Sequence, residues 1–157
     1  NGWKYQQYIA CLDPLGEEMG KREYSLTPEL YGEFLIRLFR LWDKDWKKGR
    51  APVIRQFENY IGILMGYEPE ACEQRGRCSL QCVADGREFV RESYRTDPEC
   101  EACRWYSLCR GGCRRHRIRD DGSEIYRNYF CEGYRMFFER CYKRMSEIAQ
   151  YARIIKM

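Results

Sequence analysis

The sequence contains a single histidine, His116, which lies between arginines. It has no glycine-rich phosphate loop, no nucleophile elbow around a serine and no helix with a His-Glu metal motif, so the common catalytic signatures are absent. It also has no run of 18 apolar residues, and residues 1–20 lack the layout of a signal peptide. We therefore expect a soluble, cytoplasmic protein without a membrane partner, and we expect His116 at the surface rather than in a metal site.

The charge balance does not point to a nucleic-acid partner. The chain carries 28 Lys and Arg residues against 24 Asp and Glu residues. So small an excess does not by itself indicate binding to a polyanion, and we do not expect nucleic acid as a partner. Hydrophobic residues make up 44% and aromatic residues 15% of the chain, which is enough for a folded core. A length of 157 residues fits one ordinary domain or two small ones.

Cysteine carries the strongest signal in the sequence. Four of the ten cysteines fall between Cys100 and Cys113, with gaps of two, five and three residues. A Cys-x2-Cys step places two sulfurs on one side of a tight turn, and Gly111 and Gly112 let the backbone wrap closely around a metal centre. All-cysteine ligation is typical of iron–sulfur clusters and of structural zinc. We favour iron–sulfur over zinc, and either over disulfides, because the cysteines occur at metal-ligand gaps in a chain long enough to fold without crosslinks.

The beginning of the chain reads as a strand followed by a helix. Aromatic and β-favouring residues predict a strand over Trp3–Leu12, and we interpret Cys11 at its end as a small buried residue. Thr27 as N-cap and Pro28 as first residue predict a long helix that Gly49 ends. The apolar face of this helix is expected to consist of Leu30, Phe34, Leu35, Leu38, Phe39 and Trp42.

Two further helices are expected. After an extended piece at Val53–Ile54, a second helix should run from Gln56 to Met65, and a long helix from about Asn128 to Ile155 should end the chain. The inward face of the second helix is expected to be Phe57, Tyr60, Ile61 and Leu64. The apolar face of the long helix is expected to be Tyr134, Phe137, Phe138, Cys141, Met145, Ile148, Ala149, Ala152 and Ile155. Cys141 is therefore expected in the core, whereas Cys131 lies at the helix entrance, where the helix dipole favours a thiolate.

The tract from Tyr67 to Ile125 is polar, rich in arginine and poor in aliphatic residues. Apolar burial alone does not offset an ordering cost of about 1.5 kcal/mol per residue in such a segment, so we expect bound metal to stabilise it. Spacing allows two sets of ligands. The first set is Cys100, Cys103, Cys109 and Cys131. The second set is Cys72, Cys78 and Cys113, with Cys82 as the only nearby candidate for a fourth ligand.

Five arginines are interleaved with these cysteines, namely Arg110, Arg114, Arg115, Arg117 and Arg119. Four thiolates on a [4Fe–4S] core leave a net charge of about −2, which nearby cations would neutralise. We favour this role over a solvated basic face that touches phosphate, because the arginines alternate with candidate ligands rather than with stacking aromatic residues.

The sequence resembles the C-terminal part of the anaerobic sulfatase-maturating enzymes, which are radical S-adenosylmethionine proteins with a SPASM-type auxiliary-cluster domain. The resemblance covers nearly the whole chain, and its multi-cysteine block is specific. It is carried by QYIACLDPLGEE (7–18), LTPELYGEFLIRLFRLW (26–42), IRQFENYIGILMG (54–66), CEQRGRC (72–78), CEACRWYSLCRGGCRRHR (100–117) and YFCEGYRMFFE (129–139).

This resemblance implies an α+β fold in which residues 1–66 end a partial (β/α) barrel. Residues 67–157 would form a small cysteine-rich, metal-cluster domain with the long C-terminal helix. One auxiliary [4Fe–4S] cluster would be held by the first cysteine set and another by the second. The family oxidises a Cys or Ser side chain of a sulfatase peptide to formylglycine, with a radical made from S-adenosylmethionine.

Two departures from the family pattern limit what this chain does alone. The radical-generating Cys-x3-Cys-x2-Cys motif is not complete, since Cys78 and Cys82 supply its first gap but position 85 is Asp. S-adenosylmethionine is therefore expected only in the full-length parent. The family also continues here through a segment with a further cysteine and an acidic residue, so we expect a deleted or disordered segment at the Gly86–Arg87 junction. The alternative interpretation is a stand-alone interaction module that binds zinc or a cluster, and zinc could replace iron in either case.

Overall fold

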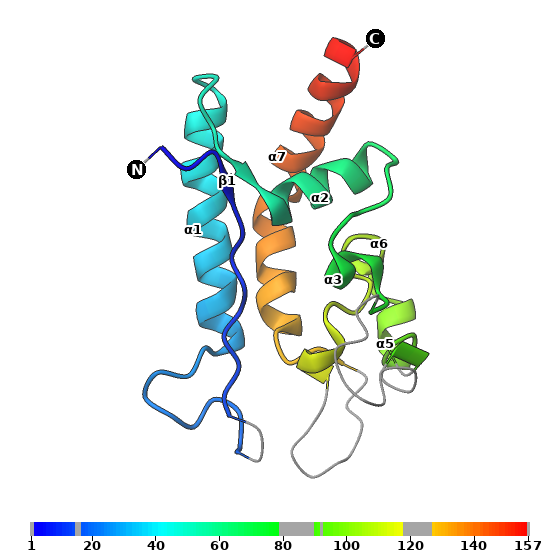
Figure 1. Ribbon diagram of the computed structural model, residues 1–157. Coiled ribbons are helices and arrows are strands. Elements are labelled where there is room, and N and C mark those ends of the chain that lie inside the picture. Colours follow the sequence, from blue (N-terminus) through cyan, green and yellow to red (C-terminus); the bar gives the residue numbers. More distant parts are fainter. Residues whose placement is uncertain (1, 15–16, 79–89, 92, 118–126, 157) are drawn as a thin grey trace.

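The computed structural model describes residues 2–14, 17–78, 90–91, 93–117 and 127–156. Its longest elements are the helices α1 (Pro28–Trp46), α2 (Arg55–Leu64) and α7 (Cys131–Lys156). Figure 1 shows α1 along one side of α7, with the short helices of the cysteine-rich segments on the other side. These short elements are α3 (Cys72–Arg75), α5 (Pro98–Glu101), α6 (Tyr106–Cys109) and the 3-10 helix η1 (Arg114–Arg117).

The described strands form a small parallel sheet, so the expected mixture of helices and strands is confirmed. β1 (Tyr5–Gln6) pairs with β2 (Val53–Ile54), with Tyr5 opposite Val53. The prediction of a strand over residues 3–12 is wrong, because in the described part of the chain only two of those residues pair with a partner strand. The prediction that Cys11 is buried is also wrong. Cys11 lies beyond β1 in an irregular segment, and its side chain is exposed.

Local sequence signals place α1 correctly. The Thr27 hydroxyl accepts a hydrogen bond from the Leu30 backbone N–H at 3.3 Å, and Pro28 is the first helical residue. The helix ends at Trp46 with Lys47 as its C-cap, whereas Gly49 follows with a φ of +67°. The predicted apolar face is correct for Leu35, Phe39 and Trp42, which are buried. It is wrong for Leu30 and Phe34, which remain 54% and 39% exposed because they lie away from the faces that contact α7 and α2.

Helix α2 confirms its prediction within one residue at each end. It begins directly after β2, and its buried residues include Phe57, Tyr60 and Ile61. Asn59 connects α2 to the segment before α3, since its Oδ1 accepts hydrogen bonds from the backbone N–H groups of Glu70 and Ala71 at 2.7 and 3.1 Å. The helix therefore fixes the backbone that leads into Cys72.

Helix α7 starts three residues later than expected, after a turn in which the Cys131 N–H donates to the Asn128 carbonyl at 3.0 Å. The Asn128 Oδ1 atom accepts a hydrogen bond from the Phe130 N–H at 2.9 Å, and Cys131 is the first helical residue. The predicted buried face is confirmed for Tyr134, Phe137, Phe138, Cys141, Met145, Ile148 and Ala149. It is wrong for Ile155, which is 64% exposed in the last turn.

The hydrophobic core is built on α7. Two neighbouring phenylalanines of this helix contact different parts of the structure. Phe137 contacts Phe39 of α1 and Phe57 of α2, with ring centroids 6.0 and 5.9 Å apart. Phe138 contacts Tyr60 of α2 and Trp105 of the cysteine-rich segment, at 5.1 and 5.6 Å. Packing of the long helices is thereby coupled to packing of the segment that carries the cysteines. Of the helices that the structure describes, none combines the length and apolar character that a membrane crossing requires.

Candidate metal centre

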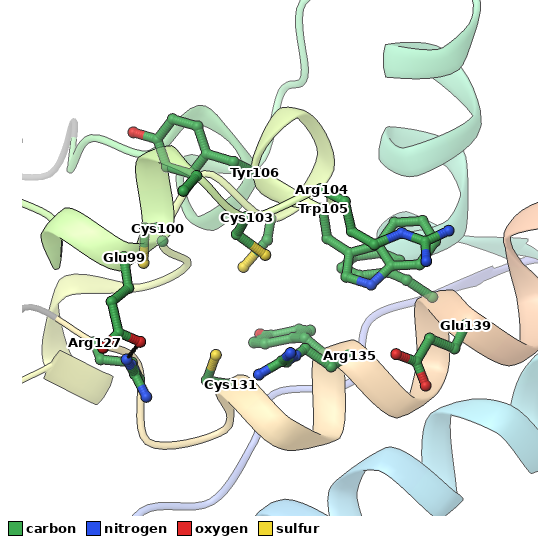
Figure 2. Close-up of a pocket in the computed structure, with 15 residues that line it drawn as sticks. Glu99, Cys100, Cys103, Arg104, Trp105, Tyr106, Arg127, Cys131, Arg135 and Glu139 are labelled. Atoms are coloured by element: carbon green, nitrogen blue, oxygen red, sulfur yellow. Dashed lines mark hydrogen bonds and ion pairs between the residues drawn. The ribbon is translucent and has the colours of Figure 1, made fainter.

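The first two cysteines of the first set lie in a short capped turn. Asp97 caps α5, and its carboxylate accepts a hydrogen bond from the Glu99 N–H at 2.8 Å. The Cys100 N–H donates to the Asp97 carbonyl at 2.8 Å, and the Cys103 N–H donates to the Cys100 carbonyl at 3.1 Å. These bonds wind the Cys-x2-Cys step so that both thiols lie on the same side of the segment, as Figure 2 shows.

A left-handed turn joins Cys109 to Cys113. Arg110, Gly111 and Gly112 have φ values of +49°, +78° and +63°, and the Gly112 N–H donates to the Cys109 carbonyl at 2.9 Å. Glycine suits such a run because it has no Cβ to clash with the backbone. Gly112 also lies against the start of α7, since a Cβ there would be 2.5 Å from Asn128 Nδ2, just before the helix, and 3.7 Å from Tyr134 Cε2 within it. The two glycines therefore let this turn approach the start of α7.

Two polar side chains connect the start of α7 to the other cysteine segments. Asn128 Nδ2 donates to the Gly111 carbonyl at 3.3 Å. The Arg127 guanidinium forms ion pairs with Asp97, at 3.4 Å, and with Glu99. Cys131, at the first position of α7, is thus held near Cys100 on one side and near Cys109 on the other.

The four cysteines of the first set line one cavity of about 430 Å³. Figure 2 shows Cys100 and Cys103 on one wall and Cys131 on the opposite wall. Cys109 belongs to the same lining, together with the apolar side chains of Trp105, Tyr134 and Phe138. The structure therefore brings the four predicted residues together around one space, although they are separated by up to 31 positions in the sequence.

The electrostatics of the first set show that the thiols lie close to one another. The pKa of Cys109 is raised to about 12, mainly by burial and also by negative charge on Cys131, Cys100 and Cys103, while a hydrogen bond from the Gly111 N–H acts in the opposite direction. Burial raises the pKa of Cys131, and negative charge on Cys100 acts in the same direction. Four thiolates in this cavity would repel one another, so a bound cation is required to stabilise them together.

The cavity is large for one metal ion. Four sulfurs around a tetrahedral zinc lie about 2.3 Å from the metal, which puts neighbouring sulfurs about 3.8 Å apart and leaves no cavity between them. Among the residues that the structure describes, no group of three or more His, Cys, Asp or Glu side chains is arranged to hold a metal ion. The four thiols therefore share one cavity, and in the described structure they are not arranged as the ligands of a single metal ion.

The second set, Cys72, Cys78 and Cys113, also converges. Burial raises the pKa of Cys72, and negative charge on Cys113 and Cys78 raises it further. Burial likewise raises the pKa of Cys113, with smaller contributions from Glu73 and Cys78. The proposed fourth residue, Cys82, and Arg119 lie outside the described residues, as does the Gly86–Arg87 junction.

Two backbone contacts position the segment that carries Cys72 and Cys78. The buried Ser93 hydroxyl accepts a hydrogen bond from the Cys78 N–H at 2.8 Å. Gly76, between Cys72 and Cys78, has a φ of +72°, and a Cβ there would lie 2.7 Å from the Arg110 carbonyl oxygen.

The nine cysteines of the described residues are all free thiols. No pair of them forms the alternative disulfide framework.

The structure corrects the sequence-based view of His116 and shows that Arg117 is also buried. His116 is only 7% exposed, packs edge-on against Phe130 at 5.1 Å, and has no hydrogen-bond partner at Nδ1 in the described structure. The pKa of His116 is lowered to about 4, mainly by burial and also by the positive charges of Arg115 and Arg117. Arg117 is 1% exposed. The flanking arginines had suggested a solvated segment, and the sequence carries no signal that η1 turns these two side chains inward.

Comparison with known proteins places this arrangement in a family context. No protein-family model matches the chain. The cysteine-type anaerobic sulfatase-maturating enzyme of Clostridium perfringens (strain 13 / Type A) is 33% identical over 181 residues, covering 94% of this chain and 49% of the relative. The enzyme of the same description from Clostridium novyi (strain NT) is 31% identical over 182 residues, with the same coverage of both chains.

Solved structures agree with the sequence comparison. The structure described as native anSMEcpe with bound AdoMet and Cp18Cys peptide superposes with a TM-score of 0.85 at 32% identity, covering 95% of this chain and 51% of that chain. Native anSMEcpe with bound AdoMet superposes with a TM-score of 0.84 at 31% identity. The fold and these relatives define a chain related to the radical S-adenosylmethionine enzymes. More specifically, it is a relative of the anaerobic sulfatase-maturating enzymes and corresponds to their C-terminal part.

The match is incomplete in two respects. The chain spans about half the length of the curated relatives it matches. Within the matched region it is also shorter, because the match to the C. perfringens enzyme extends over 181 residues while 94% of this 157-residue chain is about 148 residues. This chain therefore lacks about 30 residues that the relative has in that region.

Proposed function

We propose that this chain is the auxiliary-cluster part of a radical S-adenosylmethionine enzyme that oxidises a Cys or Ser side chain of a sulfatase peptide to formylglycine. Residues 1–66 would complete a partial barrel, and residues 67–157 would hold the clusters. Cys100, Cys103, Cys109 and Cys131 would bind one [4Fe–4S] cluster. Cys72, Cys78 and Cys113 would bind the other, with its fourth position supplied from outside the described residues or left open. S-adenosylmethionine and the radical motif would belong to the remainder of the parent enzyme.

The observation that carries this proposal is the cavity lined by four cysteines from three separate segments. Thiolate ligands and the absence of histidine from the lining suit an iron–sulfur group. The mutual effect of the thiols on their pKa values supports the same conclusion, because a metal group would replace the protons and relieve the repulsion. A radical that takes one hydrogen atom from the substrate side chain removes one of the two electrons of the oxidation, and a bound cluster would supply a one-electron acceptor for the other.

The residues of this chain would orient and shield the group. Arg127 holds the Cys100 turn beside the start of α7 through its ion pairs with Asp97 and Glu99. Trp105 and Phe138 pack on each other with ring centroids 5.6 Å apart and form an apolar wall of the cavity. Such a wall excludes water from the thiolates and strengthens their interaction with metal, because the local dielectric is low.

Anaerobic reconstitution of the 157-residue chain with iron and sulfide tests the proposal. The wild-type chain should bind about eight irons and eight sulfides if both groups are cubanes. Cys109→Ala should lose about half of the iron. Cys141→Ala is the matched control, because Cys141 is buried in the core face of α7 and is not in the cavity lining, so its iron content should remain at the wild-type value.

Two results would overturn the proposal. Wild-type protein prepared without oxygen that binds stoichiometric zinc and takes up no iron would favour the stand-alone zinc module. Equal iron in wild type and Cys109→Ala would remove Cys109 from the ligand set. The peptide part of the proposal is tested separately. This chain is joined to the part of a parent enzyme that carries the radical motif, and formylglycine in a sulfatase peptide is measured by mass spectrometry.

A further inference from the structure

Arg117 is the most deeply buried charged residue of the described chain. It is 1% exposed and belongs to η1, four residues after Cys113. Its guanidinium donates hydrogen bonds to three backbone carbonyls, those of Ser93 at 2.9 Å, Gly112 at 3.4 Å and Arg95. Its Nε atom has no hydrogen-bond partner in the described structure. Carbonyl oxygens do not neutralise the charge, so the buried cation still requires a negative partner.

The guanidinium lies against the turn that separates the two cysteine sets. A Cβ on Gly111 would be 3.7 Å from Arg117 Nη1 and 3.8 Å from its Cζ. Gly111 and Gly112 connect Cys109 of the first set to Cys113 of the second. Arg117 therefore contacts the one stretch of backbone that belongs to both sets.

The negative partners of Arg117 in the described structure are cysteines. Burial lowers the pKa of Arg117, and Arg114 lowers it further, whereas negative charge on Cys113, Cys100 and Cys109 raises it. No salt bridge joins Arg117 to a carboxylate within the part of the chain that the structure describes. Among the described residues, the groups whose negative charge raises the pKa of Arg117 are thiols of both sets, and these thiols are negative when they bind metal.

We infer that Arg117 is a positioning residue whose single positive charge is shared by both metal groups and raises the reduction potential of each. The inference rests on the proposed function. One-electron reduction adds negative charge to an iron–sulfur group, and a buried cation beside it stabilises the reduced form. A cation between two groups acts on both, and it also reduces the repulsion between them.

The test is a redox titration of the anaerobically reconstituted 157-residue chain, followed by electron paramagnetic resonance. In Arg117→Gln, both midpoint potentials should become more negative. A tenfold loss in the equilibrium constant for reduction corresponds to 59 mV for one electron, and we expect at least this shift for each group. A loaded variant in which neither potential moves, or only one moves, would overturn the inference.

Two other arginines serve as controls. Arg144 lies 13 residues after Cys131 on α7, about 20 Å along the helix, so Arg144→Gln removes one positive charge without changing either potential. Arg127 acts on Cys100 and Cys131, both in the first set, so Arg127→Gln should shift one potential and leave the other at its wild-type value. Equal shifts of both potentials in Arg144→Gln would mean that net charge rather than position is responsible, which would overturn the inference.

If Arg117→Gln does not bind iron, Arg117→Lys provides a second test of the inference. A lysine in this buried position has a lowered pKa and loses its charge within the accessible pH range. Both potentials of Arg117→Lys should then become more negative as the pH rises, with a steeper dependence than in the wild type, whose arginine stays charged. The same pH dependence in the two proteins would contradict a shared cation. Wild-type protein that takes up no iron would instead overturn the proposed function itself.

Discussion

Gly32 of α1 and Gly133 of α7 pack backbone against backbone. A Cβ on Gly32 would lie 2.9 Å from the Gly133 Cα and carbonyl oxygen, and a Cβ on Gly133 would meet the Pro28 carbonyl oxygen and lie 3.0 Å from the Gly32 nitrogen. Gly133 is two residues after Cys131, so the closest approach of the two long helices occurs beside a candidate metal ligand. The packing of α1 therefore sets where the Cys131 thiol lies.

Gly133→Ala should destabilise the fold and weaken metal binding together. The added methyl group has no space, and forced overpacking costs about 1–3 kcal/mol. Because α7 must move away from α1, Cys131 should also be displaced and the iron content should fall. Urea unfolding and iron analysis measure the two effects.

Gly62→Ala is the matched control for this substitution. Gly62 lies in α2, and a Cβ there would have no atom within 4 Å. Alanine is favoured over glycine in a helix by about 1 kcal/mol, so this variant should be slightly more stable than the wild type, with unchanged iron content. Loss of stability in both variants would argue that the Gly32–Gly133 contact has no special role.

Two substitutions at Asn128 should separate the cap of α7 from its link to the glycine turn. Asn128→Asp keeps the acceptor for the Phe130 N–H but cannot donate to the Gly111 carbonyl. Asn128→Ala loses both bonds. We expect a loss of about 1 kcal/mol from each bond, so alanine should be the more destabilising change in urea unfolding. Hydrogen exchange at residues 109–113 should increase in both variants, and protection equal to wild type would contradict the link.

His116 should make the metal-free chain sensitive to acid. Its pKa is lowered from 6.5 to about 4 in the folded state by burial, so the unfolded state takes up a proton first. This contribution to stability is present above pH 6.5 and is lost as the pH falls toward 4, by about 1.4 kcal/mol per pH unit. In His116→Phe this part of the acid dependence should disappear. Denaturant midpoints at pH 7, 5.5 and 4.5 measure it, and parallel curves for the two proteins would contradict the burial of His116.

Cys109 should make the metal-free chain less stable at high pH, whereas His116 should make it less stable at low pH. Burial raises the pKa of Cys109 from 9 to about 12, so the unfolded chain loses a proton first. This contribution to the stability of the metal-free chain is complete below pH 9 and is lost as the pH rises toward 12, again by about 1.4 kcal/mol per pH unit. Under reducing conditions, Cys109→Ala should show a shallower loss of stability between pH 9 and 10.5. An unchanged slope would indicate that the thiol is solvated.

Features set by neighbouring residues could be predicted from the sequence, and features set by distant partners could not. Thr27 and Pro28 act on their own helix, so the start of α1 was predicted correctly. The strand expected around Tyr5 depends on a partner strand, and only two of its residues pair in the described part of the chain. The contact between Gly32 and Gly133 was not predicted, because nothing near either glycine in the sequence indicates the other.

The candidate site shows the same division. Cysteine spacing grouped Cys100, Cys103, Cys109 and Cys131, and these four do line one cavity. Whether they bind a cluster remains a prediction. The burial of Arg117 was not predicted, because it results from hydrogen bonds to the Ser93 and Arg95 carbonyls, more than twenty residues away in the sequence.

The placement of Cys131 at the first residue of a 26-residue helix has a consequence for assembly. The later turns of α7 are buried against α1 and α2, so the hydrophobic core by itself is enough to place this sulfur. The other three sulfurs of its set lie on four-residue helices and turns that have little core of their own. Metal would then bind first at Cys131, whose position is already fixed. The shorter segments with the other three cysteines would close around it afterwards, so α7 would determine the geometry of the whole site.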